Sequence, residues 1–88
     1  MKIYSWSSEK NEKLIEERGI SFEDIILNIE LGNVIEIYDH PNQDKYPGQM
    51  ILAIEVEDYV YLVPFIEGEA EIFLKTIIPS RKATKRYR

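Results

Sequence analysis

The 88-residue sequence predicts a single α+β domain, in which two N-terminal helices pack on an antiparallel sheet of about four strands and a short basic helix follows. Apolar residues from Phe22 to Ile29 recur at helical spacing and indicate an amphipathic helix. From Val34 onward the apolar residues alternate with a period of two, which is typical of strands. Lysine and arginine are concentrated after the last of these strands and indicate a basic terminal helix.

One strand and one mostly charged helix are expected first. Residues 1–6 alternate as a strand does, and residues 9–18 follow two serines that can cap a helix. We expect Leu14 and Ile15 to form the small buried side of this helix, and Gly19 to end it.

The second helix has start and stop residues of its own. Ser21 opens Ser-Phe-Glu-Asp, a near capping box in which Asp24 stands where Glu or Gln is usual. Gly32-Asn33 ends the helix. Its apolar face consists of Phe22, Ile25, Ile26 and Ile29.

Four strands are predicted to follow, at residues 34–38, 50–56, 59–65 and 70–78. The second and third form a hairpin across Glu57-Asp58, and a polar loop at 41–48 precedes them. Pro64 lacks an N–H group for the ladder, so we expect it at the end of its strand or on a bulge.

Strict alternation divides the last strand into two sides. One side holds Ile72, Leu74, Thr76 and Ile78, and the other holds Phe73, Lys75 and Ile77. On this pattern Lys75 projects from the sheet toward a ligand. Pro79 is expected to end the sheet, and Ser80 to cap the final helix over residues 81–87.

The most uneven feature of the sequence is its basic segment, Lys75 to Arg88. All sixteen acidic residues precede it, and it holds six of the eleven Lys and Arg residues, on a chain whose net charge is −5. Such segregation favours a local anionic target, and phosphate is the commonest one. A solvated, frayed terminus without a partner would have the same composition.

The composition excludes several other classes of function. No cysteine is present, which removes disulfides and thiolate metal sites and is compatible with a reducing cytoplasm. The single histidine and four scattered glycines favour neither a metal centre nor a phosphate-binding glycine loop, so no cofactor is expected. No apolar run is long enough for a membrane span, and the N-terminus lacks a signal-peptide pattern.

Arginine and lysine near aromatic residues can bind RNA phosphates and stack on bases. Such groups can also cleave RNA without a metal: the 2′-hydroxyl attacks its own phosphate while cations stabilise the transition state and an acid protonates the leaving oxygen. In the loop at 41–48, Lys45 and Tyr46 suit contact with phosphate and a base, although loop polarity alone also explains them. His40 is either a solvated loop residue or a catalytic one, and Trp6 either a core anchor or a platform for a base.

Two stretches of the sequence resemble the BrnT family of type II toxins. The first runs from Trp6 through Lys10-Asn11 to the Gly-Ile-Ser-Phe-Glu-Asp of residues 19–24, and the second is Ile-Ile-Pro-Ser-Arg-Lys-Ala-Thr-Lys-Arg at 77–86. The resemblance implies a RelE-like ribonuclease toxin, encoded beside a ribbon-helix-helix antitoxin. It further implies a complex that represses its own operon, with operator DNA bound only through the antitoxin, and a homodimer or a heterotetramer with the antitoxin as the assembly.

The resemblance also assigns site residues. Arg81 and Arg86 would stabilise phosphate charge, and Lys85 would assist leaving-group protonation or charge neutralisation. The expected RNA-binding residues are Lys75, Lys82, Lys45 and Tyr46, with Lys10 and Lys13 as weaker additions. The sequence departs from the family pattern at Arg18, where relatives often have His, and in lacking an arginine between Arg18 and Arg81.

A function from another class also fits these observations. The net charge of −5 would repel free RNA from much of the surface. The alternative is therefore a non-enzymatic interaction module whose basic end docks on an acidic protein partner.

The charges of the last residues lead to a prediction about order. Arg81 and Lys85 are four residues apart, as are Lys82 and Arg86, and like charges at that spacing oppose a helix. We expect residues 80–88 to be poorly ordered in the free protein and to become protected when an acidic antitoxin surface covers them. Amide hydrogen exchange on the free and bound forms measures this. Protection equal to that of the central strands in the free protein would make the segment a packed structural element instead.

Overall fold

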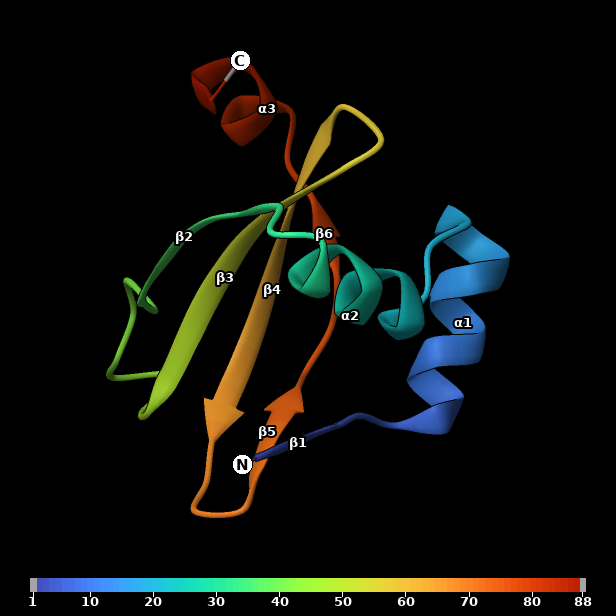
Figure 1. Cartoon of the computed structure of the whole chain (residues 1–88). Helices are drawn as coiled ribbons and strands as arrows, with labels where there is room; N and C mark the ends of the chain where they lie inside the picture. The colour runs from blue at the N-terminus through green and yellow to red at the C-terminus, as the bar shows by residue number, and fades with distance from the viewer. Residues whose placement is uncertain (1, 88) are drawn as a thin grey trace.

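The computed structural model describes residues 2–87, so Met1 of the expected first strand and Arg88 of the basic segment lie outside the described residues. The chain has α+β architecture, as predicted (Figure 1). No helix within residues 2–87 is long and apolar enough to cross a membrane. In chain order the elements are β1 (Ile3–Ser5), α1 (Ser8–Arg18), α2 (Phe22–Glu30), β2 (Val34–Asp39), β3 (Gln49–Val56), β4 (Tyr59–Glu67), β5 (Glu71–Leu74), β6 (Ile78–Pro79) and α3 (Arg81–Tyr87).

The sheet differs in detail from the expected set of about four antiparallel strands. Within the described residues it has six strands in the order β1-β5-β4-β3-β2, with β6 also paired to β4. It is mixed, because β1 runs parallel to β5 whereas the other pairs are antiparallel. The predicted hairpin is present, and Glu57 and Asp58 at its turn have φ values of 49° and 66°, as a two-residue turn of this kind requires.

One face of the sheet forms the core with α1 and α2. Its buried sheet residues are Leu52, Ile54, Val63, Phe65 and Leu74, and the buried helix residues in the same cluster are Leu14, Phe22 and Ile25. The prediction for α1 was wrong in one respect, because Leu14 is 2% exposed but Ile15 is 50% exposed. The second buried position of α1 is Asn11 instead.

The predicted last strand is divided into β5 and β6, and the break between them lies opposite Pro64 of β4. Pro64 is buried within β4, contrary to the expectation that it would end a strand or sit on a bulge. Its carbonyl oxygen accepts a hydrogen bond of 2.8 Å from the Lys75 N–H, but it has no N–H to donate in return. The hydrogen-bond ladder between β4 and β5 therefore ends after β5. The strict alternation of sides predicted for residues 70–78 fails for the same reason.

Beyond the break the chain pairs with β4 again through β6. Ile77 is fully buried in the core, whereas Ile78 is 42% exposed, which reverses the predicted sides. Pro79 does take part in the sheet, opposite Tyr61, contrary to expectation. It can do so because it is the last residue of a two-residue strand.

Helix α3 contacts β4 through hydrogen bonds, and the poor order expected for residues 80–88 in the free protein stays a prediction. The Thr84 hydroxyl accepts a bond of 2.9 Å from the Val60 N–H and donates one of 2.7 Å to the Ser80 carbonyl. The Ser80 N–H donates to the Val60 carbonyl at 3.0 Å, and its side chain caps the helix by accepting from the Ala83 N–H. Two of these contacts, the ones that Val60 makes with Thr84 and with Ser80, join α3 to β4 across a long stretch of sequence.

The side chain of Asn11 joins α1 to α2 through hydrogen bonds. Its side-chain oxygen accepts from the Phe22 N–H at 2.7 Å, and its nitrogen donates to the Glu23 carboxylate at 2.7 Å. The Phe22 N–H is one of the N-terminal groups of a helix that have no partner within the helix. Trp6 stacks on the Phe22 ring with centroids 5.6 Å apart, which favours the core-anchor interpretation of Trp6.

The Asn11 contacts yield a stability prediction. Replacing Asn11 by alanine leaves the buried Phe22 N–H without a partner, which should lower the free energy of unfolding by about 1–3 kcal/mol. Urea denaturation at neutral pH measures the change. The matched control is Glu12→Ala on the exposed side of α1, expected to change it by less than about 0.5 kcal/mol. Equal effects of the two substitutions would contradict the role given to Asn11.

The effect of Asn11→Ala on the free energy of unfolding is also expected to depend on pH. The hydrogen bond from Asn11 holds the pKa of Glu23 below its ordinary value of 4.5. A carboxyl whose pKa is lowered by folding contributes stability above its unfolded pKa, and this contribution is lost as the pH falls through the folded pKa. The difference between the wild type and Asn11→Ala should therefore shrink when denaturation is repeated below pH 4.5.

Candidate functional site

The face of the sheet opposite α1 and α2 carries the features of a site. The strand register places Glu36, Tyr38, Leu62, Pro64 and Phe73 on this side, which we call the open face. Helix α3 covers one end of it, because its residues line a pocket together with Glu36, Tyr38 and Leu62. The rest of the open face contains a second, larger pocket.

The larger hollow, here called the loop pocket, has a volume of about 510 Å³. It is bounded by the loop between β2 and β3, by β4, and by the segment that follows β5. It also reaches the first turn of α1. Its polar and aromatic lining includes Lys10, His40, Tyr46, Phe73, Lys75 and Thr76.

The loop between β2 and β3 is shaped by the side chain of Gln43. Its amide nitrogen donates to the carbonyls of His40 and Gln49, and its amide oxygen accepts from the Gly48 N–H at 3.0 Å. These bonds tie both ends of the loop together. They hold His40 against Tyr46, with ring centroids 4.5 Å apart, at the wall of the loop pocket.

The hydrogen bonding of His40 defines its protonation pattern. The ring atom Nδ1 accepts a bond of 3.0 Å from the Asn42 N–H, so the proton of the neutral ring lies on Nε2. In this state His40 is a hydrogen-bond donor toward a ligand. Acting as a general acid would require a second proton on Nδ1 and the loss of the bond to Asn42.

Lys75 lies on the same side of its segment as Phe73 and lines the loop pocket next to Pro64 of β4. Its backbone N–H is held by Pro64, and its Nζ lies 5.8 Å from the centroid of the Phe73 ring on the open face. The described lining residues include two lysines and one histidine but no Asp or Glu. On a chain with net charge −5, this is a locally cationic hollow suited to an anion.

The second hollow, here called the helix pocket, lies between α3 and β2 and has a volume of about 250 Å³. Its described lining includes Glu36, Tyr38, Leu62, Lys82, Arg86 and Tyr87. The Tyr87 hydroxyl donates a short hydrogen bond to the Glu36 carboxylate, and the Arg86 guanidinium carbon lies 5.5 Å from the Tyr87 ring centroid. Cations and a carboxylate thus share this pocket.

The tyrosine hydroxyls of the helix pocket are held in their protonated form. The bond to Glu36 raises the pKa of Tyr87, and burial, followed by the charge of Glu36, raises the pKa of Tyr38. Both groups are hydrogen-bond donors at neutral pH, as an ordinary tyrosine is, and the raised pKa extends this state to higher pH. A ligand in the pocket meets two phenols rather than phenolates.

The structure distributes the predicted site residues between these places. Lys75 and Tyr46 line the loop pocket, and Lys82 and Arg86 line the helix pocket. Lys45 is exposed beside the loop pocket, with its Nζ 5.4 Å from the Tyr46 ring centroid. Arg81 and Lys85 are exposed on α3 and line neither pocket, so Arg81, Lys85 and Arg86 are not gathered in one hollow.

Sequence reasoning missed the position of several residues. His40, Lys10 and Thr76 join Lys75 in the loop pocket, and Glu36 faces the cations of α3. These residues come from elements far apart in the chain, so no local spacing indicates that they meet. Lys13, a weaker candidate, lines a shallow depression with Ser7 and Glu9 instead.

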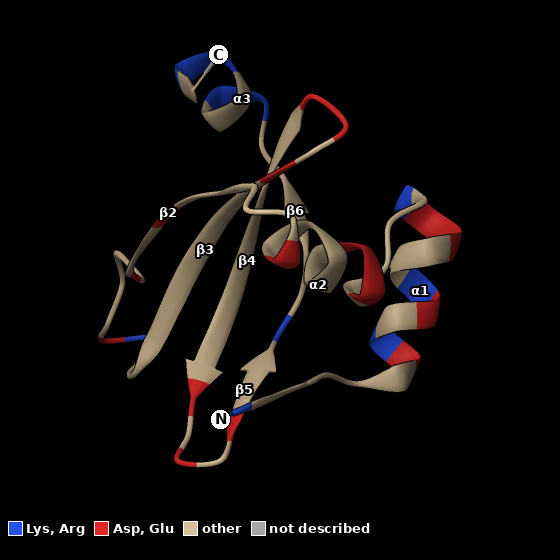
Figure 2. Ribbon diagram, viewed as in Figure 1, with Lys and Arg blue, Asp and Glu red and all other residues tan. Residues whose placement is uncertain are grey.

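The stretches that resemble the toxin family act mainly as scaffold. Asn11, Ser21 and Phe22 join the first two helices, whereas Ser80 and Thr84 dock α3. Arg18, at the main departure from the family pattern, donates to the Ile77 carbonyl at 2.5 Å. Figure 2 shows Lys and Arg on α3, on α1 and on the segment between β5 and β6.

Within residues 2–87 no group of three or more His, Cys, Asp and Glu residues is placed to hold a metal ion. No protein-family model matches the chain, and comparison with curated proteins and with solved structures also finds no significant match. The geometry of the open face therefore carries the functional argument.

The hydrogen bond to His40 can be tested directly. His40 is the single histidine of the chain, so its ring nitrogens give unambiguous NMR signals. Long-range ¹H–¹⁵N spectra of the neutral ring should show Nε2 protonated and Nδ1 as an acceptor, because Nδ1 is occupied by the Asn42 N–H. A neutral ring protonated on Nδ1 would contradict the orientation described here.

Proposed function

We propose that this chain is the toxin component of a type II toxin–antitoxin system, with RelE-like architecture, and acts in the cytoplasm as a metal-independent endoribonuclease. The substrate phosphate would occupy the loop pocket. The observation that carries the proposal is the lining of that pocket, which brings Lys10, His40 and Lys75 together without a carboxylate. Tyr46 adds an aromatic ring on which a base can stack.

The loop pocket suits cleavage by the RNA's own 2′-hydroxyl. In this reaction the 2′-oxygen bonds to phosphorus, the bond to the 5′-oxygen breaks, and a proton passes from the 2′-oxygen to the leaving oxygen through solvent. Negative charge grows on the other phosphate oxygens. Lys10 and Lys75 would stabilise this charge, and the Nε2–H of His40 would donate to one of these oxygens.

Helix α3 would extend the contact with RNA beyond the reacting phosphate. Arg81, Lys82, Lys85 and Arg86 make no ion pair within residues 2–87, so their charges are available to a polyanion. Leu62 of the helix pocket and Pro64 of the loop pocket are two residues apart on the same side of β4, which separates them by about 7 Å. One RNA strand can therefore follow both pockets.

Two assignments of the chemistry compete. In the first, Lys75 and His40 in the loop pocket act on the phosphate. In the second, which follows the family resemblance, Arg81 and Arg86 stabilise the phosphate and Lys85 assists the leaving group. The first is favoured because its residues line one hollow, whereas Arg81 and Lys85 lie outside both pockets.

The rival function remains an interaction module without catalysis. Glu36 favours it, because a carboxylate among the cations of the helix pocket weakens that pocket's attraction for RNA phosphates. The exposed cations of α3 would then dock an acidic protein surface. A ribbon-helix-helix antitoxin is the proposed partner under either function.

An RNA-cleavage assay on purified variants tests the proposal. Lys75→Ala should lower the cleavage rate by a factor on the order of 100, as loss of one charge-stabilising group does in other enzymes. His40→Ala should lower it as well, whereas Arg81→Ala should mainly weaken binding. The control Lys2→Ala removes one positive charge from the ion pair with Glu67 and should not affect cleavage.

The outcomes separate the candidate functions. Loss of cleavage in Arg81→Ala and Arg86→Ala, with folded Lys75→Ala fully active, would support the assignment to α3 over the loop pocket. A wild type that neither cleaves RNA nor binds it at low salt, but binds the product of a neighbouring gene tightly, would support the interaction module. A steep fall of RNA affinity with salt is expected if several phosphates are neutralised.

A further inference from the structure

The cleavage proposed above makes no use of Glu36 or of the two tyrosines of the helix pocket. We propose that the helix pocket binds a guanine base, with the Glu36 carboxylate accepting hydrogen bonds from the N1–H and N2–H groups of guanine. Where the guanine belongs to RNA, this inference rests on the proposed function. The base itself can equally come from a free guanine nucleotide.

The size and lining of the helix pocket suit one flat aromatic ring system. Leu62 and Ala83 give it apolar surface, and Tyr38 and Tyr87 supply aromatic rings beside it. Its volume of about 250 Å³ lies just below the range of roughly 300–1,000 Å³ usual for pockets that enclose larger ligands. Bases that proteins recognise outside a helix are bound by such stacking, combined with hydrogen bonds to the Watson–Crick edge.

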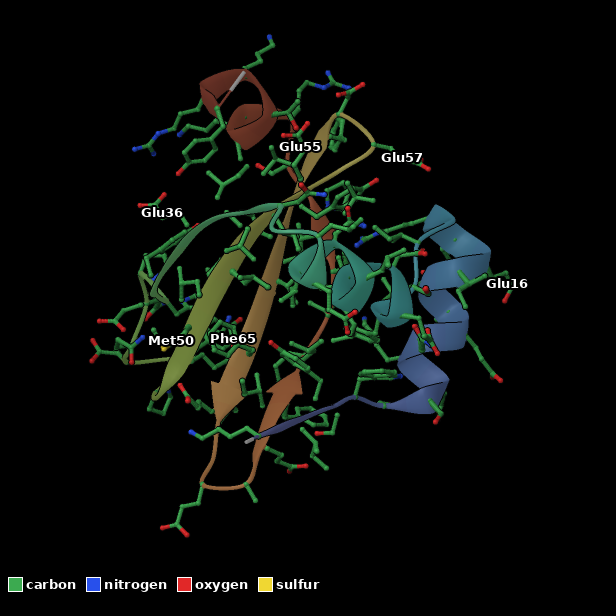
Figure 3. The ribbon with its side chains drawn as sticks, in the orientation of Figure 1. Glu16, Glu36, Met50, Glu55, Glu57 and Phe65 are labelled. Atoms are coloured by element: carbon green, nitrogen blue, oxygen red, sulfur yellow. The ribbon has the colours of Figure 1, made fainter. Side chains whose placement is uncertain are left out.

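Glu36 is placed to read that edge. The Tyr87 hydroxyl donates to Oε2 of Glu36, which fixes the carboxylate at the wall of the pocket. Figure 3 shows the Glu36 side chain between β2 and α3. A carboxylate has about four acceptor positions, so the bond from Tyr87 leaves room for two more donors. The side chain of Glu36 is exposed, so a ligand can reach it.

Guanine is the base that matches a carboxylate. Its Watson–Crick edge presents two adjacent donors, N1–H and N2–H, which a carboxylate can accept together. Adenine and cytosine each present one amino group next to a ring acceptor, and uracil presents one N–H between two carbonyls. These acceptors would face the negative charge of Glu36, so the other three bases are disfavoured.

The cations of the helix pocket fit the remainder of a nucleotide. Arg86 is held over the Tyr87 ring, and Lys82 lies one helical turn before it on α3. Both line the pocket and can contact a phosphate attached to the bound nucleoside. Their charges also offset that of Glu36, so an anionic nucleotide is not repelled.

Binding of free nucleotides tests the inference without any cleavage. The affinities of 5′-GMP, 5′-AMP, 5′-CMP and 5′-UMP are measured by NMR titration of the full chain. GMP should bind on the order of ten times more tightly than the other three, as expected for one bidentate base contact. Equal affinities for the four nucleotides would overturn the inference.

Glu36→Gln is the decisive variant. Glutamine can still accept the bond from Tyr87, but its amide offers one acceptor oxygen, so the preference for GMP should fall while affinity for the phosphate remains. Glu16→Gln on α1, remote from the pocket (Figure 3), is the matched control and should keep the preference. A Glu36→Gln variant that is folded by circular dichroism and still prefers GMP would also overturn the inference.

Mapping of RNA cleavage products then separates the two sources of guanine. If guanine in RNA is the ligand, wild-type cuts should fall at a fixed distance from a guanine, and Glu36→Gln should lose this pattern. A preference for GMP without cleavage or binding of RNA would support a free-nucleotide site and refute the proposed ribonuclease. Cleavage of RNA with neither a guanine pattern nor a preference for GMP would refute the guanine site and leave the ribonuclease proposal standing.

Discussion

The missing N–H group of Pro64 is the constraint on which both pockets depend. Because the central strand β4 cannot complete its ladder at that point, the chain after β5 leaves the sheet and returns as β6. Lys75 still shares the open face with Phe73, whereas the departure sends Ile77 into the core. The return through β6 sets Ser80 beside Val60, and α3 starts there over the open face.

In this arrangement one face of the sheet forms the core and the other carries the two pockets. The face toward α1 and α2 is filled by the core, and the loop pocket and the helix pocket lie on the other side. There α3 shields one end, and the loop after β2 closes the opposite end. Much of the acidic charge lies on helix surfaces and at strand turns (Figure 2), which leaves the loop pocket as a cationic region on an acidic molecule.

Local signals in the sequence predicted the local parts of the fold. The capping box of Ser21 and Asp24 is present, Gly19 ends α1 with a positive φ of 67°, and the turn at Glu57-Asp58 joins β3 to β4. Features that depend on partners distant in sequence could not be predicted in this way. The buried contacts of Asn11 and the anchoring of α3 by Thr84 join residues from separate elements, and alternation alone cannot show where a proline breaks a ladder.

The site was predicted only in part for the same reason. The sequence drew attention to Lys75 and Tyr46, which both line the loop pocket, but did not show that His40 and Lys10 lie with them. The four cations of α3 are close in sequence, yet a helix distributes them around its surface, so that Lys82 and Arg86 line the helix pocket and Arg81 and Lys85 do not.

The parallel pairing of β1 with β5 affects how the chain can fold as it is synthesised. Ile3 lies opposite Glu71, so β1, which is synthesised first, has no strand to pair with until β5 has been synthesised. The contact between Arg18 and the Ile77 carbonyl also joins distant parts of the chain. Such long-range pairings slow folding, because the entropy of closing a long loop is lost before the contacts form. A ribosome-bound chain that lacks β5 and β6 would therefore have α1, α2 and the central hairpin but neither α3 nor a completed open face.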